Sequence, residues 1–268
     1  MPADVEPDLL AMVSPAVLIC LLGGFRVLKA GARVSVRSGG KTAALLASLA
    51  LRDRHRASRE ELIETLWPEA DASRSGHALN SLVYALRQLL GDALEGAPPI
   101  IYSAGVYQLN VDAGVKVDIV QFDALSRTAE QNLRQGNVTA AVRLWRQAVA
   151  LYHGDVCTGV DDGVRTIVQR ERLRALYLSL LGSLADQSFR DRDYAAALDH
   201  TLRLLSHDPC REDAHRLTMR CHVRLGERAQ ALRQYRVCEQ ILASEFDARP
   251  EPATVALFHQ VRLDPASI

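Results

Sequence analysis

The sequence has few of the features that mark disulfide-rich, disordered or metal-ribbon proteins. Its five cysteines are odd in number and include no Cys-x-x-Cys pair, which argues against a disulfide framework and against a zinc ribbon. Only 16 glycines and 10 prolines occur in 268 residues, so long disordered segments are not expected. We expect reduced, mostly buried thiols in a cytoplasmic protein.

Long hydrophobic runs are also missing. The apolar stretch 9–22 follows three acidic residues, is interrupted by Pro15 and lacks an Ala-x-Ala-like cleavage site, so it does not match a signal peptide. A membrane span needs roughly 18 or more apolar residues in a row, and no run reaches that length. We therefore expect no membrane partner.

The chain lacks net charge, because 32 basic residues balance 32 acidic ones. The molecule as a whole consequently has no bulk attraction to nucleic acid. The distribution is uneven, however, since residues 26–59 contain nine basic residues and a single acid, Asp53. Local basicity of this kind can guide contacts with phosphates, and a solvated face of an arginine-rich protein has the same pattern.

Strand and helix signals follow one another in a recognisable order over residues 16–112. Three short β-prone runs predict a small antiparallel sheet, and three helices and a hairpin follow it. Ser58 and Glu61 have the spacing of a capping box at the start of the second helix. The expected ranges are 17–22, 25–28 and 33–36 for the strands, 41–51, 58–66 and 73–90 for the helices, and 100–102 with 106–109 for the hairpin. This is the order of a winged helix-turn-helix.

The helix expected at 73–90 has two chemically different faces. Its apolar face contains Leu79, Leu82, Val83, Leu86 and Leu90, and its opposite face contains Arg74, His77, Ser81, Tyr84 and Gln88, with Asn80 and Arg87 on the flank. A helix that docks on a core and turns hydrogen-bonding groups outward has the form required in a DNA major groove. Any amphipathic surface helix shows the same pattern.

Beyond residue 112 the pattern changes to successive helices with a repeat. Ala197-Leu198 and Ala231-Leu232 are 34 residues apart, which is the tetratricopeptide period. The small–large–small set Ala141, Trp145, Ala148 recurs as Ala231, Tyr235, Cys238, so we expect stacked helical hairpins. The predicted fold is mainly α: a flexible tail (1–15), a winged helix-turn-helix domain (16–112), a linker (113–116) and an all-α tetratricopeptide-like domain (117–264).

No motif for catalysis, cofactor binding or metal binding stands out. Gly39-Gly40-Lys41-Thr42 resembles a phosphate-binding loop, but Ser35 occupies the position where the upstream glycine is required. His215 and His222 are seven residues apart, which does not match zinc-ligand spacing. We expect no enzymatic activity, no cofactor and no metal.

Several segments together resemble the SARP type of bacterial transcriptional regulators (Streptomyces antibiotic regulatory proteins). These proteins join an OmpR/PhoB-like winged helix to a bacterial transcriptional activator domain built of tetratricopeptide-like helices. The segments are GGKTAALLASLAL (39–51), SREELIETLWP (58–68), ALNSLVYALRQLLG (78–91), VDIVQF (117–122) and LGERAQALRQY (225–235). They occur in the family's order over roughly residues 17–263.

The resemblance implies a sequence-specific DNA-binding regulator that activates transcription. The 73–90 helix would enter the major groove and the wing the minor groove of double-stranded promoter DNA. The second domain would mediate homodimer contacts and contacts with RNA polymerase. The residues that we assign to DNA are His77, Asn80, Ser81, Tyr84 and Gln88 for bases, Arg74 and Arg87 for phosphate or guanine, Lys41 and Arg59 for the backbone, and Tyr102 and Ser103 from the wing.

The predicted interface is less cationic than the resemblance leads one to expect. Gln88 and Ala85 occupy positions where basic residues are common in the family, and the wing sequence 102–106 contains no Arg or Lys. Weaker non-specific DNA binding follows from fewer cationic contacts. The alternative is a helical-repeat interaction scaffold, or a ligand sensor, whose winged helix has weak or no affinity for DNA.

Overall fold

The computed structural model describes residues 15–37, 39–69, 72–156 and 164–268. The predicted tail therefore lies outside the described residues except for Pro15, and Ser38 also lies outside them. The chain divides into two compact units, residues 1–124 with 151–173 and residues 125–150 with 174–268. Within the described part, none of the helices has the length and apolarity needed to cross a bilayer.

A four-stranded sheet opens the first unit. Strands β1 (Val17–Cys20), β2 (Arg26–Lys29) and β3 (Ala32–Val34) are antiparallel neighbours, as predicted. The fourth strand, β7 (Val115–Val117), pairs with β1 in parallel, so the sheet is mixed. The stretch 113–116, expected to be a linker, thus contains the beginning of a sheet strand. Its alternation of Val115, Lys116 and Val117 fits a strand with one buried face.

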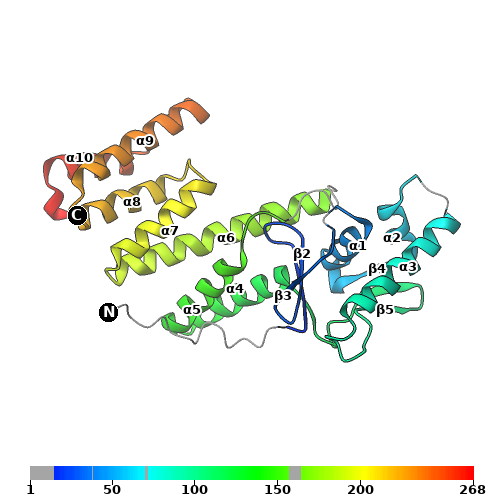
Figure 1. The fold of residues 1–268 in the computed structure, drawn as a ribbon. Helices are drawn as coiled ribbons and strands as arrows, with labels where there is room; N and C mark the ends of the chain where they lie inside the picture. The colour runs from blue at the N-terminus through cyan, green and yellow to red at the C-terminus, as the bar shows by residue number, and fades with distance from the viewer. Residues whose placement is uncertain (1–14, 38, 70–71, 157–163) are drawn as a thin grey trace. The chain divides into compact units, whose positions relative to one another are not determined.

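The winged helix-turn-helix is confirmed in the same unit (Figure 1). Three helices are followed by a hairpin, and the hairpin joins a third strand in a sheet of order β4-β6-β5. The elements are α1 (Lys41–Ala50), the 3-10 turn η2 (Asp53–His55), β4 (Arg56–Ser58), α2 (Arg59–Leu66), α3 (Ala72–Leu90), β5 (Ile100–Ser103) and β6 (Val106–Leu109).

The start of α2 has the predicted capping box. The Glu61 N–H donates to Ser58 Oγ at 3.1 Å, and the Ser58 N–H donates to Glu61 Oε2 at 2.8 Å. The Ser58 N–H, helped by the nearby Arg52 guanidinium, holds the pKa of the Glu61 carboxyl below its ordinary value. These reciprocal bonds satisfy two backbone donors that a helix start otherwise leaves without partners.

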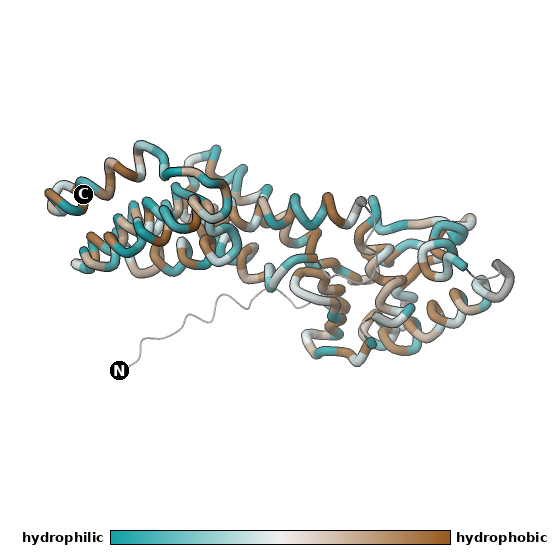
Figure 2. The backbone as a smooth tube through the Cα atoms, turned by 90° about the horizontal axis from the view of Figure 1, so that it is seen from above, coloured by the Kyte–Doolittle hydropathy of each residue, from teal (hydrophilic) through white to brown (hydrophobic). Residues whose placement is uncertain are grey.

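The helical repeats are also confirmed. Helices α7 and α9 begin at Tyr194 and Arg228, 34 residues apart, and Ala197 and Ala231 are both fully buried. The helices are α4 (Asp118–Arg134), α5 (Val138–Leu151), α6 (Val164–Arg190), α7 (Tyr194–His207), α8 (Glu212–Arg224), α9 (Arg228–Phe246) and α10 (Pro252–Leu263), with the 3-10 turn η3 (Pro265–Ser267) at the end. Hydrophobic and hydrophilic residues alternate along them in Figure 2, as helices that lend one face to a neighbour require.

Both histidines that we considered as metal ligands have contacts inside the repeats. His215 is buried, with Nε2 at 2.8 Å from the Pro209 carbonyl and Nδ1 at 2.7 Å from Gln234 Nε2. His222 Nδ1 lies 2.7 Å from Glu227 Oε2. Burial lowers the pKa of His215, which favours its neutral form as a structural group within the second unit.

The Asp118 carboxylate ties the start of α4 to the first unit. It is buried, and its Oδ2 accepts the N–H groups of Leu21 and Leu22 at 2.8 and 2.9 Å. Its Oδ1 accepts the Ile119 N–H at 2.8 Å. Burial raises the pKa of this carboxyl. These bonds and the β7 pairing explain why the first compact unit continues past the boundary at 112 that the sequence pattern indicated.

Three of the thiols are expected to resist labelling in the folded protein. Cys20, Cys221 and Cys238 are buried and free of disulfides, and burial raises their pKa to about 11, 11 and 12, respectively. The thiolate is the reactive form, so a maleimide at pH 8 should leave these three unlabelled, as read by peptide mass mapping. Labelling as fast as in denaturant would contradict this expectation.

Candidate nucleic-acid interface

The inner face of α3 is fixed by the core of the first unit. Leu79, Leu86 and Leu90 are almost completely buried, and Leu82 and Val83 are half-buried. Lys29 of β2 holds the end of the helix, because its Nζ donates to the Leu89 carbonyl at 3.2 Å and pairs with Asp92 at 2.6 Å. A cation at a helix C-terminus compensates the unpaired carbonyls there. The predicted apolar face of α3 is thus confirmed.

The outer face of α3 presents polar side chains to solvent. Tyr84 is 64% exposed, and Ala85 beside it is exposed too. The Ser81 hydroxyl donates to the His77 carbonyl at 3.0 Å, so it offers lone pairs outward. The assigned residues on this face that the structure describes, all exposed, are His77, Asn80, Ser81, Tyr84, Arg87 and Gln88. The side chain of Arg74 lies outside the described part of the structure.

The wing is a tight hairpin that carries Tyr102 and Ser103. Its turn residues Ala104 and Gly105 both have positive φ, 49° and 83°, which is typical of the two-residue turn that matches strand twist. Tyr102 is 52% exposed, and Ser103 is exposed as well. The ring centroid of Tyr102 lies 4.4 Å from that of Tyr107 on the neighbouring strand.

Tyr107 and Arg59 join the wing to the helices, and no local sequence pattern indicated the role of Tyr107. Tyr107 is buried in β6, and its hydroxyl donates to Asn80 Oδ1 on α3 at 3.0 Å. The Arg59 N–H donates to the Gly105 carbonyl in the wing turn at 3.0 Å. The Arg59 guanidinium lies against Gly76 of α3, where a Cβ atom would clash with its Nη2. These contacts therefore hold α2, α3 and the wing in fixed positions relative to one another.

Lys41 has a contact within the fold. Its Nζ donates to the carbonyl of Leu66, the last residue of α2, and lies 5.8 Å from the ring centroid of Trp67. The ammonium therefore neutralises the C-terminal end of α2. The structure thus gives Lys41 a role within the fold, and its contact with the DNA backbone stays a prediction.

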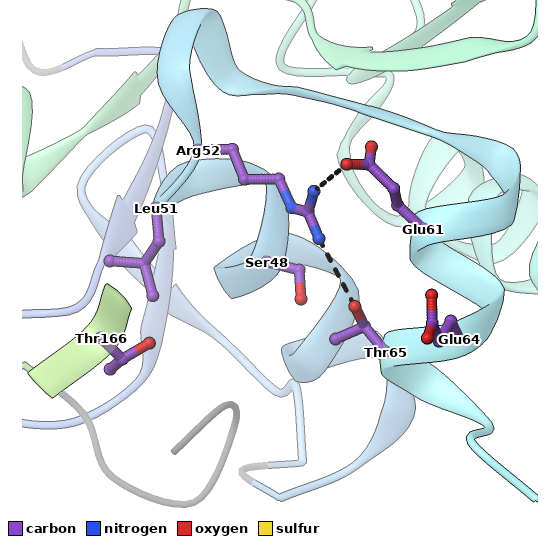
Figure 3. Close-up of a pocket in the computed structure, with 7 residues that line it drawn as sticks. All are labelled: Ser48, Leu51, Arg52, Glu61, Glu64, Thr65 and Thr166. Atoms are coloured by element: carbon purple, nitrogen blue, oxygen red, sulfur yellow. Dashed lines mark hydrogen bonds and ion pairs between the residues drawn. The ribbon is translucent and has the colours of Figure 1, made fainter. Parts of the chain in front are cut away.

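A polar cavity of about 310 Å³ lies in the same unit, beside α1 and α2 (Figure 3). Arg52 points into it, with its guanidinium 3.0 Å from Glu61 Oε1 and 3.5 Å from Thr65 Oγ1. Ser48 of α1 also lines it, and its buried hydroxyl has no partner among the described residues. The ion pair between Arg52 and Glu61 links the loop after α1 to α2, and it therefore helps to hold α2, the helix that precedes α3.

The fold and the outer face of α3 define a class of protein, the winged helix-turn-helix regulators with a tetratricopeptide-like second domain. Residues 33–105 match the family model described as "Transcriptional regulatory protein, C terminal". Residues 117–262 match the model "Bacterial transcriptional activator domain". The chain belongs to this family of SARP-type transcriptional regulators.

Individual relatives agree with this assignment. The chain is 30% identical over 254 residues to the regulatory protein AfsR of Streptomyces coelicolor, covering 94% of this chain and 25% of AfsR. It is 26% identical over 162 residues to the regulatory protein DnrI of Streptomyces peucetius, covering 60% of this chain and 59% of DnrI. It thus spans about a quarter of the length of AfsR.

A solved structure shows the same fold. Mycobacterium tuberculosis EmbR, solved in complex with a low-affinity phosphopeptide, superposes with a TM-score of 0.72 at 22% identity. The match covers 95% of this chain and 68% of the EmbR chain. The arrangement of a winged helix followed by helical repeats is therefore shared with an experimental structure.

Proposed function

We propose that this protein is a sequence-specific DNA-binding regulator that activates transcription. The observation that carries the proposal is the outer face of α3, which is exposed, polar and rigidly supported next to the wing. Helix α3 reads the major groove, because amide, hydroxyl and imidazole groups there can hydrogen-bond base edges. In this proposal residues 16–112 bind DNA and residues 117–264 form the activator domain. The protein acts in the cytoplasm, where promoter DNA is found.

The proposed contacts fall into three groups. Bases are read by His77, Asn80, Ser81, Tyr84 and Gln88. Phosphates or guanines are contacted by Arg74 and Arg87, and the sugar–phosphate backbone by Lys41 and Arg59. Tyr102 and Ser103 reach the adjacent minor groove. Phosphate contacts of this kind fix the register of a protein on the duplex, while base contacts select the sequence.

The second domain provides the protein contacts in this proposal. Its stacked hairpins expose extended helix faces, which repeat proteins use to bind other proteins. We assign to them contacts with a second copy of the chain and with RNA polymerase. A homodimer would read two half-sites, which raises the affinity of a weakly charged interface through the second, intramolecular contact.

The salt dependence of DNA binding tests both the proposed function and the small number of cations in the proposed interface. Each phosphate contact adds about −0.9 to the slope of log K against log salt concentration. The four assigned cations, Arg74, Arg87, Lys41 and Arg59, predict a slope of about −4 for each bound protomer and about −7 for a homodimer on two half-sites, against roughly −10 for a strongly basic repressor. The slope can be measured by fluorescence anisotropy on a site selected from genomic fragments. A slope as steep as that of such a repressor would contradict the assignment of a weakly charged interface.

The same selection separates the proposal from the alternative. An interaction scaffold or ligand sensor without DNA affinity should retain no genomic fragments at any salt concentration, whereas a regulator should enrich a common sequence. The exposed, cation-poor character of α3 is the observation behind this alternative. Enrichment of a shared motif at moderate salt would decide for the regulator.

A further inference from the structure

A hydrogen bond joins the buried Tyr107 of β6 to the exposed Asn80 of α3. Tyr107 lies on the central strand of its sheet, paired with Ala57 of β4 on one side and Tyr102 of β5 on the other. Its ring is buried and in contact with Tyr102. The phenol is thus held by two strands and a neighbouring ring, and its hydroxyl reaches Asn80 Oδ1 at 3.0 Å.

Tyr107 is the donor in this hydrogen bond. A phenol hydroxyl can donate or accept, and here its proton points to Asn80 Oδ1, which accepts it. The two N–H donors of the Asn80 amide are then left for a ligand.

The consequence concerns the bases that Asn80 can read. A free Asn recognises adenine by a bidentate pair, with its oxygen accepting from N6 and its nitrogen donating to N7. That pair requires the amide oxygen and nitrogen to face the base together. The bond from Tyr107 uses one of the two lone pairs of Oδ1 and turns that atom toward β6, so the oxygen and the nitrogen do not face a base together. The amide then meets a base with its N–H donors, which suit the O6 and N7 acceptors of guanine or the O4 acceptor of thymine.

We propose that Tyr107 is a specificity-determining positioning residue, which fixes the Asn80 amide as a donor so that this position reads guanine or thymine and disfavours adenine. This inference rests on the proposed DNA-binding function. It adds a residue that never touches DNA to the determinants of the recognised sequence. It also assigns one member of the α3 face to a definite class of base-edge group, the hydrogen-bond acceptor.

The test compares sequence selection by the full chain with Tyr107→Phe and Asn80→Ala. The position that loses its base preference in Asn80→Ala identifies the base read by Asn80. Wild-type protein should prefer guanine or thymine there. Removing the Tyr107 hydroxyl frees the amide to rotate, so Tyr107→Phe should bind the adenine site about tenfold better relative to the wild-type preference. A Tyr235→Phe variant, which loses a hydroxyl in the second unit, is the matched control.

The outcomes separate this inference from the proposed function. Wild-type protein that selects no sequence would overturn both. A selected sequence whose Asn80 position is unchanged in Tyr107→Phe, or is adenine in the wild type, would overturn the role of Tyr107 alone. If Tyr107→Phe melts below the assay temperature, Asn80→Asp replaces it: this variant keeps an acceptor for Tyr107 but turns a second acceptor outward, so its preference should move to cytosine, whose N4 donates. Retention of guanine or thymine in that variant would count against the inference.

Discussion

Replacing Tyr84 and Gln88 together by alanine is expected to abolish specific promoter binding while leaving the protein folded. Both side chains are exposed on α3 and one helical turn apart, so they reach neighbouring positions in the groove. A good base contact is worth about 1–3 kcal/mol. Loss of two such contacts therefore weakens binding by roughly two orders of magnitude or more. Anisotropy titration on the selected site measures the loss.

The control for this double variant is a pair with the same geometry elsewhere. Arg236 and Gln240 are exposed and also four residues apart, on α9 of the second unit. Arg236→Ala with Gln240→Ala should bind the selected site within about twofold of wild type, since surface substitutions cost little. Unchanged affinity of the Tyr84/Gln88 variant would refute the assignment of the α3 face. A collapsed thermal transition would instead show that these residues support the fold.

Asp118→Ala is expected to destabilise the first unit strongly. The change leaves the N–H groups of Leu21, Leu22 and Ile119 without their acceptor. A buried polar group without a partner costs about 1–3 kcal/mol, so the total should be roughly 3 kcal/mol or more. At about 2–4 °C for each kcal/mol in a chain of this size, the melting temperature should fall by about 10 °C.

Two further variants make the Asp118 measurement specific. Asp118→Asn keeps one acceptor oxygen and the side-chain volume, so its loss should lie between that of wild type and Asp118→Ala. Asp112→Ala removes an exposed carboxylate six residues earlier and should change the free energy of unfolding by less than about 0.5 kcal/mol. Equal melting temperatures for all four proteins would show that the three backbone bonds do not stabilise the unit.

Local sequence signals predicted much of the fold because they act over a few residues. The Ser58–Glu61 capping box is complete within four residues, and the formed box begins α2 where the pattern indicated. The apolar period of α3 predicted the burial of Leu79, Leu86 and Leu90. The spacing of 34 between Ala197 and Ala231 predicted matching buried positions in two repeat helices. Each of these depends on helix geometry alone.

The candidate site was predictable only in part, because its support comes from residues distant in the chain. Helical periodicity placed Tyr84 and Gln88 on the outer face without further information. It did not show that the Tyr107 hydroxyl, 27 positions away, fixes the amide of Asn80. It also did not show that Gly76 makes room for the Arg59 guanidinium. Contacts of this kind leave no local pattern, since neither partner's immediate neighbours report them.

The sequence by itself determined the order of elements, the faces of α3, the repeat period and the family to which the chain belongs, since each is encoded in periodicity or in contiguous motifs. Only the tertiary structure decided where the first unit ends. The β7 strand pairs with β1 almost a hundred residues earlier, and the Asp118 carboxylate joins the two regions. Long-range strand pairing and buried hydrogen bonds depend on which groups meet after folding, so a boundary drawn from local pattern at residue 112 divides what the folded chain holds together.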